Sequence, residues 1–487
     1  MPKVLARDPA WLSRPSPGFQ LFRPEERSQT YQVPDADYEG PTRKIAHRGT
    51  EVFVAVGNEL RWADVALLKD AGEGNTSNET AEQAYRVLKT PVSRPVTQLT
   101  VSPSGDFIAI LTSHTCHVAI LPASSHLRSG DTSPLRLKTF QLGPTAHVLE
   151  QAPLVSAIWH PLSPYGHCLI TTTKDSCVRM WELDRDNRAT FDEPALAVDL
   201  KKLVNASSAQ ADLSASKYGA SKGFSPESES MIAAAACFGG QGSSEEHGWA
   251  NMTFWVAMTE GDVYALCPFL PSRWRAPATL LPSLSTSVVA KTRALNGGER
   301  VSESERRLCD QQCKWLAEID GQDPSLMPGE GDFDTIEVYS RPDKPGAIPK
   351  LQGPFYLEGG LDSGEITDIH VVAPKIDDGA LYGEEYEDEE DEEGLSVGVV
   401  CLATSTSKVH VCLDLNGVEA AWLPSKRSRS LMLDEEAEDL ELLLFETVDL
   451  AVSGTDDESW PTFTPSASDR YEPVSYTHLT LPTKRIV

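Results

Sequence analysis

The feature that most constrains this sequence is the recurrence of short apolar strands separated by tight turns. Glu51–Gly57 and Leu60–Val65 read as two strands joined by a turn at Gly57-Asn58. Farther along, Val96–Val101 leads into Ser102–Asp106, a turn in which proline sets φ and glycine tolerates positive φ. Strands that alternate with turns of this kind predict antiparallel hairpins.

The same unit recurs along the chain, and Val155–Pro161 repeats the placement of a strand before a proline turn. On a later strand, Val178 and Met180 are expected to share a buried face, with Arg179 on the exposed one. The further predicted strands are Phe107–Thr112, His117–Leu121, His167–Thr173, Cys177–Trp181, Thr253–Thr259, Asp262–Leu266, Ile366–Ala373, Val397–Thr404 and Lys408–Leu413, with Val418–Leu423 as a candidate fourth strand and Glu441–Leu450 as the start of another unit.

Repeated units of three or four antiparallel strands indicate an all-β protein with the β-propeller architecture. A β-sandwich would place every strand in two sheets, and this chain has too many widely spaced units for that. A strict WD-type repeat is absent, since Trp181-Glu182 stands once where a Trp-Asp dipeptide would. The predicted propeller covers residues 45–473 and follows an N-terminal extension, residues 1–44.

Two insertions differ in their composition. Residues 205–248 are rich in Ser, Ala and Gly and are expected to be mobile. Residues 302–319 predict an amphipathic helix, because Ser302 and Glu305 have capping-box spacing. The residues at helical spacing on its apolar face are Leu308, Cys309, Gln312, Trp315, Leu316 and Ile319. This helix either packs on its own propeller or binds a partner.

The charge of the chain argues against direct binding of nucleic acid, because the net charge is −29 and such binding requires a basic surface. Nine of the ten residues in Glu384–Glu393 are acidic, within a predicted acidic loop at 376–394. We expect that run to be solvated and unstructured; the alternative is that it attracts a basic partner.

The remaining global features place the chain among cytosolic or nuclear proteins. No apolar stretch is long enough to span a membrane, and Met1–Trp11 lacks the apolar run of a secretory signal. The nine cysteines lack regular spacing, which indicates reduced thiols.

No arrangement of residues predicts a catalytic, cofactor or metal site. Glycine-rich nucleotide loops, Gly-x-Ser-x-Gly and His-Glu-x-x-His are all missing. Cys309 and Cys313 supply two thiols, but a structural zinc site needs four ligands. Alternation on a strand puts His114 and Cys116 on one face and His117 on the other, so they do not converge.

A second group of residues is interpreted as structural. His160, before Pro161, is expected to be hydrogen-bonded within the fold, because no nucleophile is identifiable beside it. Trp159, Trp181, Trp255 and Phe254 are expected to fill the wedge between blades; the alternative is a ligand cage.

The end of the chain is set apart. Val474–Thr483 reads like an in-frame translation of a sequencing adapter, so residues 474–487 are expected to lie outside the fold. The natural chain is then expected to continue beyond Pro473. An interrupted propeller would leave unpaired strand edges near Glu441–Leu450 and Val52–Val65.

Several segments, in order, resemble the family of fungal nucleoporin eighty-two, whose animal counterpart is nucleoporin eighty-eight. The resemblance runs from about Ile45 to Pro473. It is carried by Trp159–Leu162, Cys177–Leu183, Gly261–Pro271, Gln311–Trp315, Leu351–Phe355, Ile366–Ala373 and Trp460–Thr464.

The resemblance implies a seven-bladed propeller followed by coiled-coil helices, which this chain lacks. It also implies a place on the cytoplasmic face of the nuclear pore complex. The implied partners are the helical tail of a filament nucleoporin and the folded domain of a Phe-Gly nucleoporin. The implied role is in mRNA export and protein transport, without enzymatic activity, cofactor or membrane insertion.

Two other functions stay open on the sequence alone. One is a generic β-propeller adaptor in another cytosolic complex, which the absence of long heptad repeats after Pro473 would favour. The other is an enzyme of propeller fold, which would need His, Asp or Glu side chains converging at the central channel.

Overall fold

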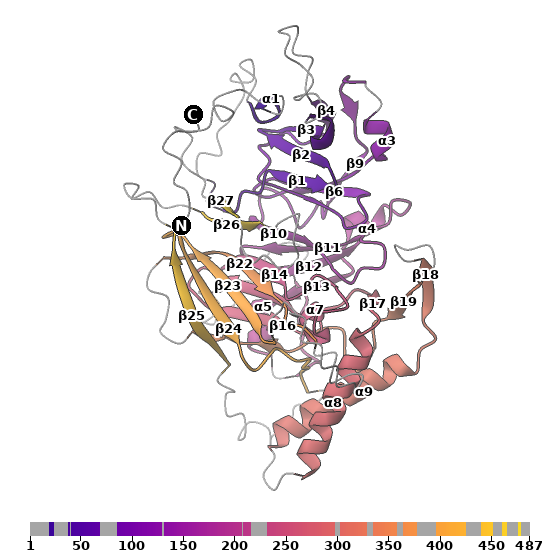
Figure 1. Cartoon of the computed structure of the whole chain (residues 1–487), viewed down its shortest axis with the longest axis vertical. Coiled ribbons are helices and arrows are strands. Elements are labelled where there is room, and N and C mark those ends of the chain that lie inside the picture. Colours follow the sequence, from indigo (N-terminus) through magenta and orange to yellow (C-terminus); the bar gives the residue numbers. More distant parts are fainter. Residues whose placement is uncertain are drawn as a thin grey trace, which may run out of the picture. The chain divides into compact units, whose positions relative to one another are not determined.

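The chain divides into two compact units, Met1–Pro144 and Thr145–Val487, in a computed structural model (Figure 1). The structure describes residues 19–23, 38, 40–68, 85–128, 131–206, 208–215, 231–297, 302–328, 335–357, 364–376, 396–424, 440–450, 460–464 and 476–478.

The described part of the first unit contains two sheets and short helices, among them α1 and α3. The first sheet has the order β1-β2-β3-β4-β8 and is antiparallel except that β8 runs parallel to β4; the second has the order β5-β6-β7-β9 and is antiparallel. The elements are α1 (Phe19–Phe22), β1 (Ile45–Arg48), β2 (Glu51–Val56), β3 (Glu59–Asp64), β4 (Arg86–Lys89), β5 (Gln98–Val101), β6 (Phe107–Leu111), β7 (Cys116–Ile120), α3 (Ser124–Leu127), β8 (Leu135–Arg136) and β9 (Thr139–Leu142).

The predicted hairpins of this unit are confirmed. Gly57 and Gly105 both adopt positive φ, 63° and 73°, at the turns where glycine was expected to permit it. The unpaired edge expected near Val52–Val65 is wrong, because β2 lies between β1 and β3, and β3 in turn pairs with β4. Side chains of both sheets, among them Phe53, Leu60 and Ile108, form one buried apolar cluster.

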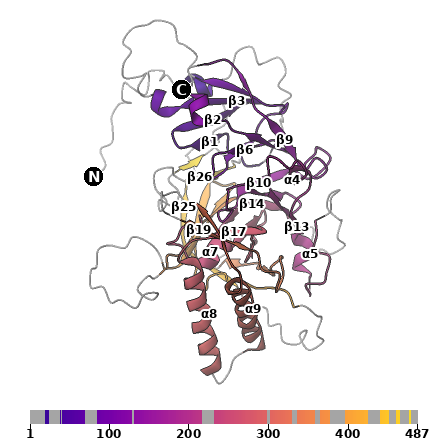
Figure 2. The ribbon, with the colours of Figure 1, turned by 90° about the vertical axis from the view of Figure 1, so that its right-hand side faces the viewer.

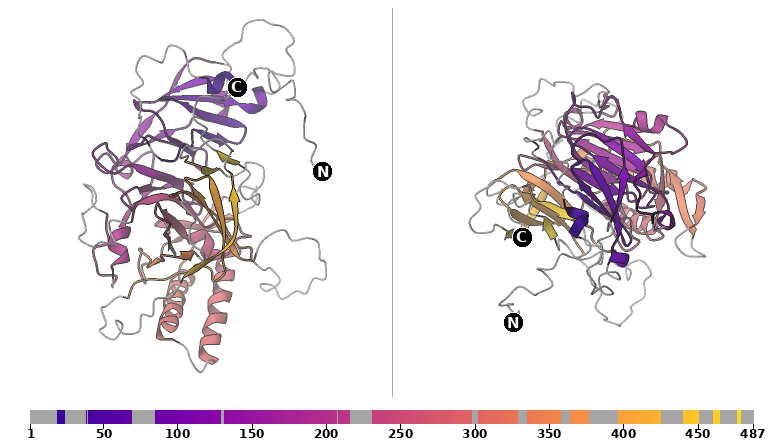
Figure 3. Two further views of the ribbon diagram at one scale, coloured as in Figure 1. Left: turned by 90° about the vertical axis from the view of Figure 1, so that its left-hand side faces the viewer. Right: turned by 90° about the horizontal axis from the view of Figure 1, so that it is seen from above.

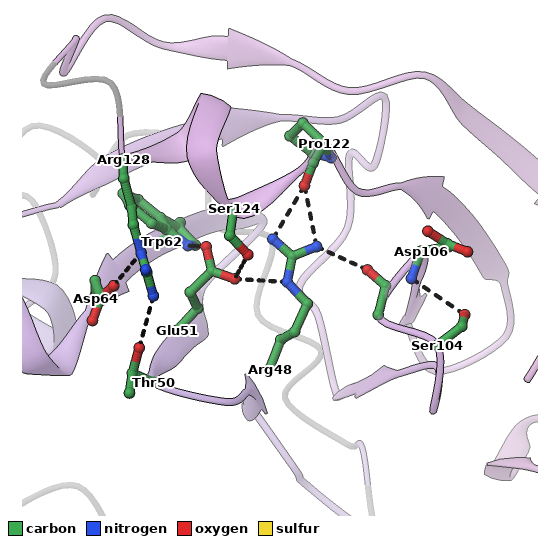
Figure 4. Close-up of polar contacts among 11 residues, drawn as sticks. Arg48, Thr50, Glu51, Trp62, Asp64, Ser104, Asp106, Pro122, Ser124 and Arg128 are labelled. Atoms are coloured by element: carbon green, nitrogen blue, oxygen red, sulfur yellow. Dashed lines mark hydrogen bonds and ion pairs between the residues drawn. The ribbon is translucent and has the colours of Figure 1, made fainter. Parts of the chain in front are cut away.

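A buried ion pair ties the two sheets of this unit together (Figure 4). Glu51 is 1% exposed, and its carboxylate accepts hydrogen bonds from Arg48 Nε at 2.6 Å, Trp62 Nε1 at 3.1 Å and Ser124 Oγ at 2.7 Å. The Arg48 guanidinium also donates to the carbonyls of Gly105 and Pro122, which flank strands of the second sheet. Both charges therefore have their hydrogen-bonding capacity used inside the protein.

We expect Glu51→Ala to lower the free energy of unfolding by about 3 kcal/mol, because it leaves the largely enclosed Arg48 guanidinium without its counter-ion and removes a buried carboxylate that accepts three hydrogen bonds. Lys89→Ala, an exposed position on β4 of the same sheet, should change it by less than about 0.5 kcal/mol. Urea unfolding of the three proteins measures both values. Equal losses for the two variants would contradict the role given to the ion pair.

The described part of the second unit contains further sheets of two to five strands, antiparallel except that β21 runs parallel to β25. Their orders are β10-β11-β12-β13, β14-β15-β16-β20, β17-β19-β18, β21-β25-β24-β23-β22 and β26-β27. Figure 3 shows the last large sheet in orange and yellow. The strands are β10 (Leu154–Trp159), β11 (Cys168–Thr173), β12 (Cys177–Glu182), β13 (Leu196–Asp199), β14 (Ala233–Phe238), β15 (Phe254–Met258), β16 (Val263–Leu266), β17 (Arg273–Ala276), β18 (Ser325–Pro328), β19 (Thr335–Ser340), β20 (Leu351–Gln352), β21 (Tyr356–Leu357), β22 (Ile366–Val372), β23 (Gly398–Thr404), β24 (Lys408–Asp414), β25 (Glu441–Asp449), β26 (Thr462–Thr464) and β27 (Tyr476–His478).

In the described part of this unit the helices are α4 (Ala189–Asp192), α5 (Leu200–Val204), α7 (Gly248–Met252), α8 (Leu280–Gly297) and α9 (Glu303–Asp320). The predicted helix at 302–319 is confirmed as α9, with the Ser302–Glu305 capping box formed in both directions. In the described part of the chain, no helix is both long and apolar enough to cross a membrane.

Four expectations about this unit are wrong. Residues 233–238, inside the segment expected to be mobile, form β14, whose alanines are buried in the core between sheets. Val418–Leu423 is not a strand, and Glu441–Asp449 does not begin a new unit, because it pairs with β24 as the outer strand of the same sheet. Arg179 is 4% exposed, because β12 is buried on both faces.

Two expectations concern segments that the structure describes only in part or not at all. The acidic run Glu384–Glu393 lies outside the described residues. Within 474–487, which was set apart as adapter sequence, Tyr476–His478 form β27 and pair with β26. Aromatic and β-branched residues favour strands whatever their origin, and the origin of this segment stays a prediction.

Candidate docking surface

A helical hairpin stands out from the sheets of the second unit. Helices α8 and α9 lie side by side and project beyond the strands in two perpendicular views (Figures 1 and 2). Helix α9 starts at its capping box, where Ser302 Oγ accepts from Glu305 N at 3.1 Å. Helix α8 was not predicted, although Leu280, Leu284 and Val288 recur at i, i+4 and i+8 and are all buried.

Trp315 anchors the hairpin to the rest of the unit. This α9 side chain is 1% exposed and lies among three other tryptophans from separate parts of the chain. Its ring centroid is 5.5 Å from that of Trp249 in α7, 6.2 Å from Trp274 in β17 and 6.3 Å from Trp422. Large aromatic side chains packed at these distances stabilise through buried area and ring geometry together.

Polar contacts one helical turn away fix the orientation of α9. Gln312 is fully buried, and its Nε2 donates to Glu419 Oε2 at 3.0 Å and to Ala420 O at 3.1 Å. Glu419 also forms an ion pair with Lys291 of α8. One carboxylate therefore connects both helices to the segment that precedes Trp422.

The helix predicted at 302–319 was expected either to pack on its own propeller or to bind a partner. The apolar face of α9 packs on its own fold, so that face is not available to a partner. The exposed side of the hairpin includes a face of α8 that no described element covers. It presents Pro282, Thr286, Val289, Ala290 and Arg293, and Val289 is 47% exposed.

The aromatic residues singled out in the sequence are all buried. Phe254 and Trp255 alternate on β15 and belong to different apolar clusters, one on each face of that strand. Trp181 donates from Nε1 to Thr171 Oγ1 at 2.9 Å. Trp159 is 7% exposed. The prediction that these residues fill the space between sheets is therefore confirmed for Phe254 and Trp255, while Trp159 and Trp181 are buried within the fold.

Two buried histidines, His160 and His147, are neutral structural groups, which confirms the expectation that His160 is hydrogen-bonded within the fold. His160 Nδ1 accepts from Leu162 N at 3.1 Å, so Nε2 carries the proton that is donated to Phe269 O at 2.7 Å. Burial lowers the pKa of His160 to about 4. His147 contacts Thr171 Oγ1 through Nε2, and burial followed by the Arg179 charge lowers its pKa to about 3.

Several buried thiols are held in the protonated form. Burial raises the pKa of Cys116, Cys177 and Cys267 to about 12 in each case, so the thiolate that acts as a nucleophile or ligand is disfavoured. Cys309 is buried and Cys313 exposed on α9, and Thr292 Oγ1 lies 2.9 Å from Cys309 Sγ. Among the described residues, no group of three or more His, Cys, Asp or Glu side chains is arranged to hold a metal ion.

We expect Trp315→Ala to cost about 3–5 kcal/mol of unfolding free energy, because a cavity opens between three tryptophans. Lys314→Ala is the matched control, since Lys314 is the exposed neighbour on the same helix. Thermal or urea unfolding measures the difference. A Trp315→Ala protein as stable as the control would show that the hairpin is not anchored by this residue.

The buried histidines make stability depend on pH. Both have pKa values in the fold below the usual 6.5 of an unfolded histidine, so their contribution is present above pH 6.5 and is lost as the pH falls toward 4. We expect a loss of up to ~1.4 kcal/mol per pH unit for each histidine in that window.

His160→Gln should reduce this slope, while His47→Gln, at an exposed position on β1, should leave it unchanged. Urea unfolding at several values between pH 7 and 4.5 gives the slopes. A His160→Gln protein with the parental slope would contradict the assignment.

Comparison with known proteins identifies the family. A family model described as the nucleoporin NUP82 β-propeller matches residues 3–478. Nucleoporin NUP82 of Chaetomium thermophilum is 43% identical over 519 aligned residues, covering 99% of this chain and 58% of the relative. Nucleoporin nup82 of Schizosaccharomyces pombe is 23% identical over 354 residues, covering 65% of this chain and 39% of the relative. The chain thus spans little more than half the length of the nearer of these two relatives.

Solved structures agree with the family. The crystal structure of the Chaetomium thermophilum heterotrimeric Nup82 NTD–Nup159 TAIL–Nup145N APD complex contains a chain 44% identical to this one, with a TM-score of 0.81. The match covers 96% of this chain and 83% of that one. The yeast heterotrimeric Nup82–Nup159–Nup116 complex matches with a TM-score of 0.51 at 14% identity over 84% of this chain and 75% of that one, a likeness of fold alone.

Proposed function

We propose a scaffold function from one premise: the chain belongs to the nucleoporin NUP82 β-propeller family. It is an all-β propeller protein, and we propose that it is a structural nucleoporin at the cytoplasmic face of the nuclear pore complex. There it would dock other nucleoporins and support mRNA export and nucleocytoplasmic transport.

The observation that carries the proposal is the likeness to the Chaetomium complex. That Nup82 domain is assembled with a Nup159 tail and a Nup145N APD, and the matched chain covers nearly all of this one at 44% identity. We therefore propose the corresponding tail and folded domain as the partners of this chain. The same family match favours a nucleoporin over a generic propeller adaptor in another cytosolic complex.

The described residues support a role in binding and not in catalysis. Both ring nitrogens of His160 are occupied, and its pKa lies well below neutrality, so it is a poor general acid or base at pH 7. The most deeply buried thiols are protonated. The exposed face of α8 is held on a helix whose partner, α9, is fixed by Trp315 and Gln312, so it is presented without freedom to reorient.

Reconstitution with the two proposed partners tests this function. The chain, the Nup159-type tail and the Nup145N-type folded domain of one organism are mixed and analysed by size exclusion with light scattering. We expect a complex with one copy of each. An unrelated propeller of similar acidity is the control for charge-driven adsorption. Separate elution at about 10 μM of each protein would contradict the proposal, because stable protein–protein interfaces of standard size normally persist at that concentration.

We also expect no tight binding to RNA. With a net charge of −29, the chain lacks the basic surface that phosphate contacts need. Filter binding of a labelled single-stranded RNA at about 150 mM salt should show no retention. Tight binding with a steep salt dependence would overturn the charge argument and point to a direct role in handling RNA.

A further inference from the structure

The outer strand of the last large sheet of the second unit presents a backbone edge that the described chain does not cover. β25 runs from Glu441 to Asp449 and pairs along its length with β24. On its other side it pairs with β21 only at Glu441 and Leu442. From Leu443 onward, no described strand lies on that side.

The register shows which backbone groups point outward. Leu450 N donates to Ser407 O at 2.9 Å, so the ladder positions facing β24 are Leu450, Val448 and Glu446. In an antiparallel ladder the residues between these point their N–H and C=O groups away from the partner strand. Thr447 therefore offers an N–H donor and a carbonyl acceptor at the open side, spaced as another strand requires.

A β-bulge adds an apolar anchor to this edge. The register of β24 and β25 shifts between Val411 and Cys412, which leaves Phe445 as the extra residue. Bulges redirect side chains. Here Phe445 is 69% exposed, the most exposed of the large apolar side chains in the described part of the protein, and Val448 nearby is 37% exposed.

The charges along the edge indicate what it accepts. Glu441 and Glu446 are exposed, and neither forms an ion pair with a described residue. A second copy of this chain would bring the same carboxylates together and would carry the same net charge of −29. A basic segment would instead neutralise them.

The fold already uses strand addition at outer strands. β8 adds in parallel to the outer side of β4, and β21 adds in parallel to the first two residues of β25 itself. Main-chain hydrogen bonds supply affinity in this mode, and pockets or charges beside alternate residues supply specificity.

We propose that residues 443–448 of β25 bind an extended segment of another protein by strand addition. That segment carries a basic side chain opposite Glu446, a second one near Glu441 just beyond the end of the open edge, and an apolar or aromatic side chain against Phe445. This surface lies on a different element from the α8–α9 hairpin and goes beyond the docking of the two nucleoporin partners.

The test uses a fluorescein-labelled octapeptide in which Lys alternates with Val, with one Phe among the apolar positions, and the full chain. A twin peptide with alternate amides N-methylated keeps the charge and side chains but cannot pair as a strand. We expect the parent peptide to bind at least about tenfold more tightly than its twin in an anisotropy titration. Hydrogen exchange should show new protection of the Thr447 amide.

Three variants locate the contact. Phe445→Ala and Glu446→Lys should each weaken binding about tenfold, as should Thr447→Pro, which removes an outward N–H and leaves the β24 ladder intact. Leu326→Ala, an exposed apolar position on β18, is the control and should bind normally. If Thr447→Pro fails to fold, the twin peptide and Phe445→Ala still decide.

Three results would overturn the proposal. Equal binding of the twin peptide would mean charge-driven adhesion only. Unchanged binding by Phe445→Ala and Glu446→Lys would place the contact elsewhere. If the chain forms a dimer and Phe445→Ala dissociates it into monomers, the occupant of the edge is a second copy of the chain.

Discussion

Burial of the central strands on both faces is the constraint on which the rest of this structure depends. Every residue of β6, β11, β15 and β23 is buried. In such strands both sets of alternating side chains lie against neighbouring structure, so most polar groups there are expected to be paired inside the protein. The chain from Trp181 Nε1 to Thr171 Oγ1 to His147 Nε2 meets this demand across β11 and β12 of the second unit, and the Glu51 carboxylate meets it in the first.

The same burial keeps internal titratable groups neutral and limits which surfaces are open to partners. Desolvation raises the pKa of the buried thiols and lowers that of His147 and His160, which leaves these groups neutral at physiological pH. Contacts with partners are expected instead on elements that neighbouring sheets do not cover. The exposed face of α8 and the outer side of β25 are of this kind, and both present apolar side chains to solvent.

Local signals in the sequence predicted much of the fold, and non-local contacts account for what they missed. The turns at Gly57 and Gly105 and the Ser302 capping box are set by neighbouring residues, so hairpins and helix α9 were found close to their true bounds. The Ala-rich run of β14 has no apolar alternation and becomes a strand only because it is covered by other sheets. Arg179 was assigned to an exposed face, since a single strand does not reveal what packs above it. The membership of β25 in the β22–β24 sheet depends on pairing across a long separation in sequence, and the exposed bulge at Phe445 follows from that pairing.

No contact residue for the nucleoporin partners could be predicted, because none of the matching segments is itself a contact motif.

The segment from Val418 to Leu423 has a structural role that its lack of regular secondary structure conceals. Its backbone accepts hydrogen bonds from Gln312 at Ala420 and from Gln311 at Trp422, and Ala421 N donates to Cys267 O after β16. Trp422 packs on Trp315, and its Nε1 donates to Gly346 O at 3.1 Å. The backbone groups of this irregular segment are paired with a helix and with the end of a strand. These hydrogen bonds replace the ones that a strand would form with its neighbours in a sheet. It follows β24 along the chain, so the sheet that carries β25 and the hairpin that carries the exposed face of α8 are both connected to the six residues 418–423. A substitution in residues 418–423 is therefore expected to destabilise both the sheet that carries β25 and the α8–α9 hairpin.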